Sequence, residues 1–168
     1  MKPLVLVLMG SPSDWEIMRH TVAELDALGI PSRAHVASAH RTPERVRTLV
    51  RDAEADGVRV FVCGAGMAAH LAGVVASLTV RPVIGVPLPG GLQGGMDALL
   101  ATVQMPGGIP VATVAVGKAG ARNAAMLAAE MIALGDPAVE AALRSARAAQ
   151  AEAVEKADAT LGGERSDA

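Results

Sequence analysis

Five strand-like runs, separated by helical patterns, constrain the fold of this chain more than any other feature of its sequence. The runs span residues 4–9, 33–36, 58–63, 83–86 and 111–116, and all but the second are rich in valine, leucine or isoleucine. Near-continuous apolar strands that alternate with helices are typical of a parallel sheet covered by helices on both faces, with right-handed crossovers. The sequence therefore predicts an α/β fold, a three-layer α/β/α sandwich with a flavodoxin-like parallel sheet.

Apolar residues between these runs recur at the spacing of amphipathic helices. Met18, Val22 and Leu25 are separated by four and three residues, which places them on one helix face. The same reasoning predicts a helix that starts at residue 43, and further helices over residues 68–77, 96–102 and 119–134. Each strand is thus followed by a helix that can cover one face of the sheet.

Two helix starts carry capping signals. Ser13 and Glu16 have the spacing of a capping box at the start of the first helix. Thr42 followed by Pro43 matches the start of the second, because a threonine can cap the helix and a proline needs no amide partner at the first position. The boundaries of both helices are therefore predicted to within a few residues.

The C-terminal region differs from the rest of the chain. Residues 136–156 form an extra helix in our prediction, but their apolar stripe is thin and mostly alanine, so this helix is expected to pack on a neighbouring subunit. We expect residues 1–157 to form one catalytic α/β domain that includes this helix. The polar residues 158–168 are expected to be a disordered tail.

Composition narrows the functional classes. The formal net charge is -2 and provides no basic field, so a nucleic-acid partner is not expected. The single cysteine, Cys63, excludes an internal disulfide and fits a reducing cytoplasm, and the apolar run 4–9 is too short to cross a membrane. Trp15 and Phe61 are the only aromatic residues, so small side chains fill the interior and subunit contacts are expected to add stability, as in a homo-oligomer.

The unusual clusters of the sequence follow the strands. They lie at residues 10–14, 38–42, 64–66 and 87–95, each directly after a predicted strand. In open parallel sheets, ligands bind beyond the carboxyl ends of the strands, near the point where the strand order reverses. All four clusters are therefore expected on one rim of the sheet.

The most informative cluster places His40 next to Arg41 in a tight turn between a strand and a helix. A histidine can exchange a proton near neutral pH, and an arginine can hold an anion in a fixed fork. Together they predict acid/base chemistry on an anionic small molecule, with His40 as the catalytic residue.

The turn after the first strand, residues 10–14, is suited to a sugar phosphate. A helix N-terminus behind such a turn favours an anion. Ser13 is interpreted as a helix cap, whereas Ser11 and Asp14 are candidate ligand residues. Since a carboxylate would repel phosphate, Asp14 is expected to accept hydrogen bonds from ribose hydroxyls, and Arg41 to meet the phosphate.

Two glycine-rich segments allow more than one interpretation. Residues 64–70 superficially resemble a dinucleotide fingerprint, but they follow the third strand and lack the acidic residue expected about 20 residues later, so a flat substrate lying against a small-residue backbone is favoured. His70 either lines the same cavity or is a packed imidazole. The glycines of residues 90–95 form either a mobile lid or a surface turn with positive φ angles, and their place on the rim favours the lid.

Four motifs, taken together, resemble a known family. They are Met9-Gly10-Ser11-x-Ser13-Asp14, Ser38-Ala39-His40-Arg41-Thr42-Pro43, Gly64-Ala65-Gly66-x-Ala68-Ala69-His70-Leu71 and Gln104-Met105-Pro106-x-Gly108-Ile109-Pro110-Val111. In this order and spacing they are similar to class I N5-carboxyaminoimidazole ribonucleotide mutases of purine (IMP) biosynthesis. Arg41 and His70 favour this class over relatives that carboxylate aminoimidazole ribonucleotide directly with CO2, which tend to have lysine after Ser-Ala-His.

The resemblance implies an isomerase that moves a carboxylate from the exocyclic nitrogen of the imidazole ribonucleotide to ring carbon C4, without metal, ATP or organic cofactor. It implies a cytoplasmic homo-octamer with sites between subunits. It also implies that the substrate is bound by Ser11, Asp14, Ser38, Arg41, Gly66, Ala68, Ala69, His70 and Leu71, with His40 as general acid and base. Direct carboxylation with CO2 and a non-catalytic nucleotide-binding module remain alternatives. The loop at Leu88 to Gly91, and Ala98 after Asp97, depart from the family pattern, so contacts of the lid are the least certain part of the resemblance.

Overall fold

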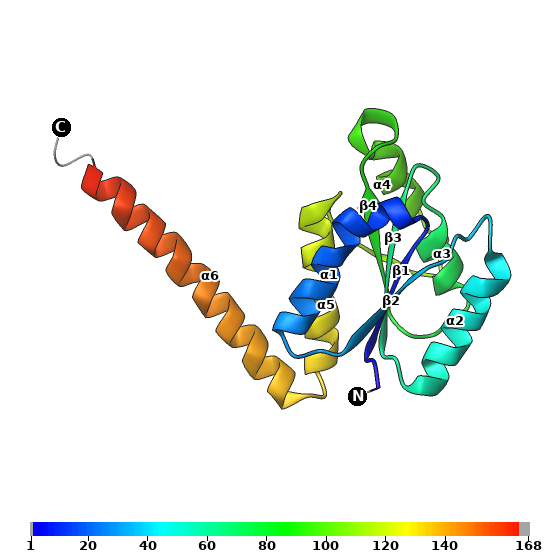
Figure 1. The fold of residues 1–168 in the computed structure, drawn as a ribbon, viewed down its shortest axis with the longest axis horizontal. Coiled ribbons are helices and arrows are strands. Elements are labelled where there is room, and N and C mark those ends of the chain that lie inside the picture. Colours follow the sequence, from blue (N-terminus) through cyan, green and yellow to red (C-terminus); the bar gives the residue numbers. More distant parts are fainter. Residues whose placement is uncertain (1, 165–168) are drawn as a thin grey trace.

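In the computed structural model, which describes residues 2–164, five parallel strands form the centre of the molecule (Figure 1). The strands are β1 (Val5–Met9), β2 (Ser32–Val36), β3 (Val60–Gly66), β4 (Val83–Leu88) and β5 (Ala112–Thr113). Their order in the sheet is β2-β1-β3-β4-β5, the flavodoxin-like order. The predicted parallel α/β fold is confirmed, and the order reverses between β1 and β3.

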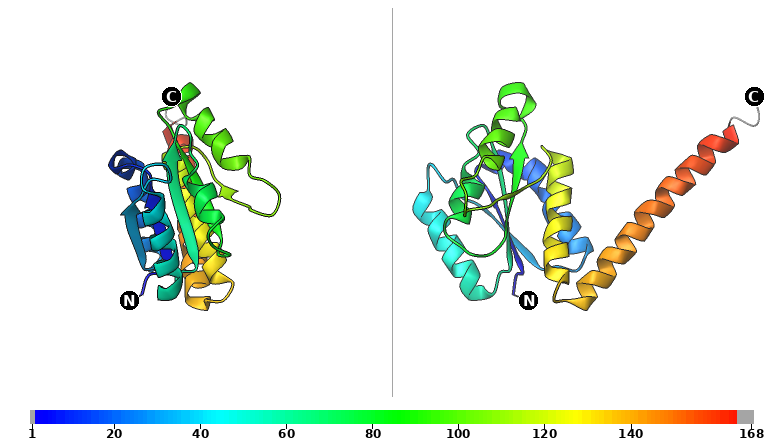
Figure 2. Two further views of the ribbon diagram at one scale, coloured as in Figure 1. Left: turned by 90° about the vertical axis from the view of Figure 1, so that its right-hand side faces the viewer. Right: turned by 180° about the vertical axis from the view of Figure 1, so that it is seen from behind.

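Helices cover both faces of this sheet (Figure 2). They are α1 (Trp15–Ala27), α2 (Pro43–Asp56), α3 (Leu71–Ala76), α4 (Met96–Val103), α5 (Lys118–Ala133) and α6 (Pro137–Glu164), with short 3-10 turns η1 (Pro12–Asp14) and η2 (Leu92–Gly94). Residues of α1 and α5 share one buried cluster, whereas those of α2 and α3 share the other. The molecule is therefore the predicted three-layer sandwich.

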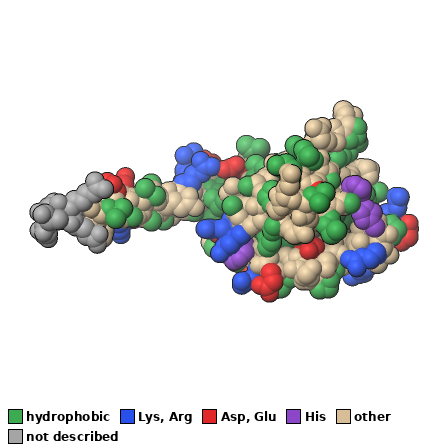
Figure 3. Space-filling view, turned by 90° about the horizontal axis from the view of Figure 1, so that it is seen from above, with side chains coloured by type: hydrophobic (Ala, Val, Ile, Leu, Met, Phe, Trp, Pro, Cys, Tyr) green, Lys and Arg blue, Asp and Glu red, His purple; other side chains and the backbone are tan. Residues whose placement is uncertain are grey.

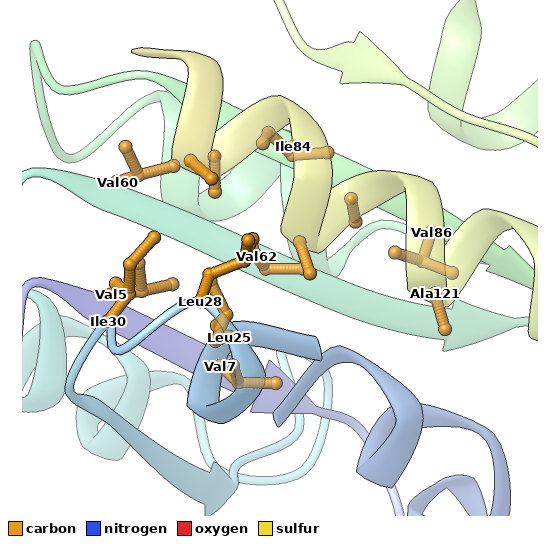
Figure 4. Packing of buried hydrophobic residues seen from close by; sticks show 14 of the residues in the cluster. Val5, Val7, Leu25, Leu28, Ile30, Val60, Val62, Ile84, Val86 and Ala121 are labelled. Atoms are coloured by element: carbon orange, nitrogen blue, oxygen red, sulfur yellow. The ribbon is translucent and has the colours of Figure 1, made fainter. Parts of the chain in front are cut away.

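The alternation of side chains along the central strands explains the two clusters. Val5 and Val7 of β1 point toward α1 and α5, and Leu6 and Leu8 point toward α2 and α3. Figure 4 shows the first cluster, in which branched residues of the strands contact Leu25 of α1 and small residues of α5. Because both faces of β1, β3 and β4 are buried, the sequences of these central strands are largely apolar, which is the signal that predicted them.

Small residues bring α5 close to the sheet and to α1. The buried residues of this helix are mostly alanine, and Gly120 in its first turn lies against the backbone carbonyl of Ala115. Thr21 of α1 donates a buried hydrogen bond of 2.8 Å to the carbonyl oxygen of Ala121. The low aromatic content therefore reflects close approach of helices rather than an empty core.

Several boundaries differ from the prediction. The fifth strand is limited to Ala112–Thr113, although the Val114 amide still donates a hydrogen bond of 3.1 Å to the carbonyl oxygen of Gly85 on β4. Helix α3 begins at Leu71, three residues later than expected, and residues 68–70 are irregular. The capping box is formed by Ser11 and Asp14 around η1, two residues before the expected pair of Ser13 and Glu16.

The last helix leaves the body of the molecule (Figure 1). Val139 and Leu143 are buried against the rest of the chain, whereas residues 147–161 are exposed. The helix extends to Glu164, so residues 158–164 are helical rather than a disordered tail, and the remainder of that predicted tail lies outside the described residues. No helix within residues 2–164 is both long and apolar enough to cross a membrane.

Candidate functional site

A cavity of about 560 Å³ lies at the carboxyl ends of β1, β2, β3 and β4, where the strand order reverses. This volume suits a small metabolite. Figure 3 looks onto this side of the molecule, where histidine side chains reach the surface beside apolar residues. The residues that line the cavity are Gly10, Ser11, Ser13, Asp14, Ser38, Ala39, His40, Arg41, Ala65, Gly66, Met67, Ala68, His70, Leu71, Leu88, Pro89 and Gly90.

The turn that carries His40 and Arg41 is fixed by its own hydrogen bonds. Thr42 Oγ1 accepts a bond of 2.9 Å from the Ser38 amide and donates one of 3.1 Å to the Ser38 carbonyl oxygen. The Ser38 hydroxyl in turn accepts from the Arg41 amide at 3.2 Å. The sequence predicted that the Thr42 side chain caps α2. In the structure this side chain closes the turn instead and makes no cap hydrogen bond. The closed turn leaves His40 exposed at the cavity.

Arg41 connects this turn to the loop after β1. Its Nη2 atom donates a hydrogen bond of 2.9 Å to the carbonyl oxygen of Gly10, and its Nε atom donates one of 3.4 Å to Ser38 Oγ. The side chain remains exposed and keeps its positive charge facing the cavity. The guanidinium is therefore placed where it can meet an anionic group of a ligand.

Asp14 is held in the loop after β1 by backbone donors. The Ser11 amide donates a hydrogen bond of 2.9 Å to Asp14 Oδ2, which completes the capping box. Partial burial raises the pKa of Asp14 above its ordinary value, and the amides of Ser11 and Gly10 and the charge of Arg41 offset part of this rise. A desolvated carboxylate of this kind is a strong acceptor for hydroxyl groups.

The raised pKa of Asp14 predicts a pH-dependent cost of folding. The folded state binds this proton more tightly than the unfolded state, so the free energy of unfolding of the wild type should rise, relative to Asp14→Asn, as the pH falls from 7 through the raised pKa. Urea unfolding of both proteins at several pH values measures this difference. A difference that stays constant, or that changes in the opposite direction, would contradict the desolvation of Asp14.

The two imidazoles at the cavity contact each other. His40 Nε2 lies 2.9 Å from His70 Nδ1, and the ring centroids are 5.0 Å apart with an interplanar angle of 83°. Both side chains are exposed and both line the cavity, so of the two interpretations of His70 the cavity position applies.

The segment after β3, residues 66–71, forms a further wall of the cavity. Ala68 and Leu71 line the cavity together with Gly66, whereas Ala69 is buried and does not line it. Met67 adopts a positive φ of 55° although it is not a glycine, and its side chain is exposed at the cavity mouth. Apart from Ala69, every residue predicted for substrate binding therefore lies at this cavity.

The glycine-rich loop after β4 closes the remaining side. Gly90, Gly94 and Gly95 have the positive φ angles expected for a turn, and Gly90 lines the cavity with Pro89. Asp97 Oδ2 accepts a hydrogen bond of 3.0 Å from the Leu92 amide, which ties the loop to α4. The turn is confirmed, whereas movement of the loop as a lid stays a prediction.

Sequence reasoning left several cavity residues out of the predicted ligand set. They are Gly10, Ser13, Ala39, Ala65, Met67, Leu88, Pro89 and Gly90. Their signal was their position directly after the strands, which identifies the rim but not the residues that face the opening.

Within residues 2–164 no three His, Cys, Asp or Glu side chains are grouped so that they could hold a metal ion. Cys63 is buried, and burial raises the pKa of its thiol.

The fold and the cavity define a doubly wound α/β protein with a small-metabolite site at its switch point. The chain belongs to the AIR carboxylase family, whose model matches residues 4–153. Among its relatives, the N5-carboxyaminoimidazole ribonucleotide mutase of Brucella melitensis is 51% identical over 150 residues, covering 89% of this chain and 93% of the relative. The enzyme of the same name from Escherichia coli is 45% identical, covering 89% of each chain.

A solved structure supports the same assignment. The crystal structure of Treponema denticola PurE has a TM-score of 0.86 to this chain, with 31% sequence identity. The match covers 95% of this chain and 98% of that one, so it includes most of the terminal helix as well as the sandwich.

Proposed function

We propose that this protein is an isomerase of purine biosynthesis that converts N5-carboxyaminoimidazole ribonucleotide into 4-carboxy-5-aminoimidazole ribonucleotide. The observation that carries the proposal is the shared cavity of His40 and Arg41, a proton-exchanging group beside a fixed cation. The relatives named as N5-carboxyaminoimidazole ribonucleotide mutases support the substrate and the reaction. No ATP, metal or organic cofactor takes part in the proposed step.

The reaction needs one proton to be given and one to be taken back. In the first step, the N–COO⁻ bond breaks, CO2 is released into the cavity, and His40 protonates the exocyclic nitrogen. In the second step, C4 bonds to CO2 and His40 removes the proton from C4, which returns the enzyme to its starting state. General acid/base catalysis of this kind contributes roughly 100- to 10,000-fold.

Retention of CO2 explains the small-residue wall. Gly66, Ala68 and Leu71 form an apolar wall of the cavity, and Ala69 of the same segment is buried. Holding CO2 beside the ring avoids its loss to water and can provide roughly 7 to 11 kcal/mol over free encounter. We assign the base and its carboxylate to this wall, to Ser38 and to His70.

The ribose phosphate is assigned to the opposite side of the cavity. Arg41 supplies the positive charge for the phosphate, and Ser11 supplies a hydroxyl beside it. Asp14 accepts from the ribose hydroxyls rather than from the phosphate, since two anions would repel each other. This arrangement uses two neighbouring segments of the rim, the loop after β1 and the turn after β2.

The deciding experiment supplies the purified protein with N5-carboxyaminoimidazole ribonucleotide and follows the C4-carboxylated product by absorbance or NMR. Fast conversion supports the mutase. Efficient product formation from aminoimidazole ribonucleotide and CO2 at low concentration would favour direct carboxylation instead. Binding of the ribonucleotide without any product would favour a non-catalytic binding module.

We further propose a cytoplasmic homo-octamer. Beyond its first turns α6 lies away from the body, and it exposes Val154 and Leu161, which a neighbouring subunit could cover (Figure 1). The protein should therefore elute at about 136 kDa, eight times 17.0 kDa, in size-exclusion chromatography with light scattering. Val154→Lys should shift the mass downward, and Ser145→Lys, a change at an exposed polar position of the same helix, should not. A 17.0 kDa species for the wild type would refute the assembly.

A further inference from the structure

The contact between His40 and His70 joins two separate segments of the rim. His40 belongs to the turn after β2, whereas His70 directly precedes α3, thirty residues later in the chain. The Nε2 to Nδ1 distance of 2.9 Å is that of a normal hydrogen bond. The interplanar angle of 83° shows that one ring meets the other edge on, so the contact is made through nitrogen atoms rather than by stacking.

A hydrogen bond between two imidazoles constrains both rings. A neutral imidazole has one nitrogen that donates and one that accepts, so only one of the two facing nitrogens can carry the hydrogen. When His40 Nε2 carries it, the Nδ1 atom of a neutral His40 is a bare base. When His70 Nδ1 carries it, Nδ1 of a neutral His40 holds a hydrogen that it can donate. The tautomers of the two rings are therefore coupled.

No other side-chain contact provides this constraint. In the part of the chain that the structure describes, the bond to His70 is the one hydrogen bond made by the His40 ring. His40 is also exposed, so surrounding side chains do not fix its orientation. An exposed ring without a partner would sample several rotamers, and misplacement of a reacting group by about 1 Å can cost roughly 100-fold in rate.

We propose that His70 is a positioning residue for His40, which it holds at the cavity edge. This inference rests on the proposed acid/base function of His40, through which His70 acts. It is separate from the contact with the base that we assign to His70 above: loss of that contact raises KM, whereas a misplaced proton donor lowers kcat.

Two variants of similar size separate the hydrogen bond from the volume of the side chain. In His70→Asn, the amide places an oxygen or nitrogen near the position of Nδ1, and it can accept from or donate to His40. In His70→Leu, a methyl group takes that position and the bond is lost. We expect kcat to fall about 100-fold in the leucine variant and less than about 10-fold in the asparagine variant, whereas loss of the contact with the base affects KM.

A double variant tests whether His70 acts through His40. If it does, His40→Asn combined with His70→Leu should be no slower than His40→Asn alone, because the residue that His70 positions is already absent. Additive losses would overturn the proposal, as would equal kcat values for the asparagine and leucine variants. His20→Leu, which removes an imidazole that does not line the cavity, serves as the control and should keep wild-type kcat.

Ring ¹⁵N chemical shifts provide a readout that does not depend on activity. The chain has four histidines, so selective ¹⁵N-histidine labelling gives few signals to assign. The His40 ring nitrogens should shift in His70→Leu and move back toward their wild-type positions in His70→Asn. Unchanged His40 shifts in the leucine variant would refute the pairing itself. If the pairing is seen but His40→Asn turns over at the wild-type rate, the acid/base function of His40 is wrong instead.

Discussion

Replacement of His40 by asparagine is expected to lower kcat for the isomerisation by about 100- to 10,000-fold. Asparagine is close to histidine in size and polarity but cannot exchange a proton near neutral pH. His40 is exposed at the cavity, so the substitution removes no core contact and leaves folding intact. Steady-state rates with N5-carboxyaminoimidazole ribonucleotide measure the loss.

The matched control for this variant is His20→Asn, which makes the same chemical change on α1 outside the cavity. It should retain the wild-type rate. Calorimetric titration of His40→Asn with the product should still detect binding, because Arg41 and Asp14 are unchanged. A His40→Asn protein with undiminished turnover would rule out the proton transfer that we assign to this residue.

The second large effect concerns stability. Gly120→Ala should lower the free energy of unfolding by about 3 kcal/mol, because a Cβ atom at this position would overlap the carbonyl oxygen of Ala115. That oxygen belongs to the backbone, so it can move only if the segment before α5 shifts. Helix propensity alone would favour alanine over glycine by about 1 kcal/mol, so the sign of the measured change separates the two effects.

Gly107→Ala is the control for this prediction. A Cβ atom at Gly107 meets nothing within 4 Å, and the φ angle of this residue is not positive. Alanine there should leave stability unchanged or raise it slightly, because it restricts the unfolded chain. Urea unfolding of both variants provides the comparison, and equal stabilities would show that the close approach at Gly120 is not limiting.

The fold was predictable because its strands carry a strong and simple signal. Strands such as β1 are buried on both faces, so their sequences are apolar throughout and differ clearly from the amphipathic helices between them. The fifth strand gave a similar signal over residues 111–116, but only Ala112–Thr113 pair with β4. Apolar composition shows that a segment is buried, and it does not show where its hydrogen bonds to the sheet end.

The location of the site could be predicted from the sequence, whereas most of its hydrogen bonds could not. The strand ends located His40, Arg41 and Asp14 on one rim, where the structure places them. The closing of the turn by Thr42 could not be derived, because a threonine before a proline fits a helix cap equally well. The same holds for the bond between His40 and His70, which depends on the relative position of two loops rather than on any local pattern.

The position of Trp15 has a practical consequence. This residue begins α1 directly after the turn that contains Ser11 and Asp14, and its side chain is 42% exposed. The chain contains one tryptophan and no tyrosine, so its intrinsic fluorescence comes from a single indole next to the proposed ribose-binding loop. The protein thus contains its own optical reporter beside this loop, and any change of its emission on titration with a ligand can be recorded without an added label.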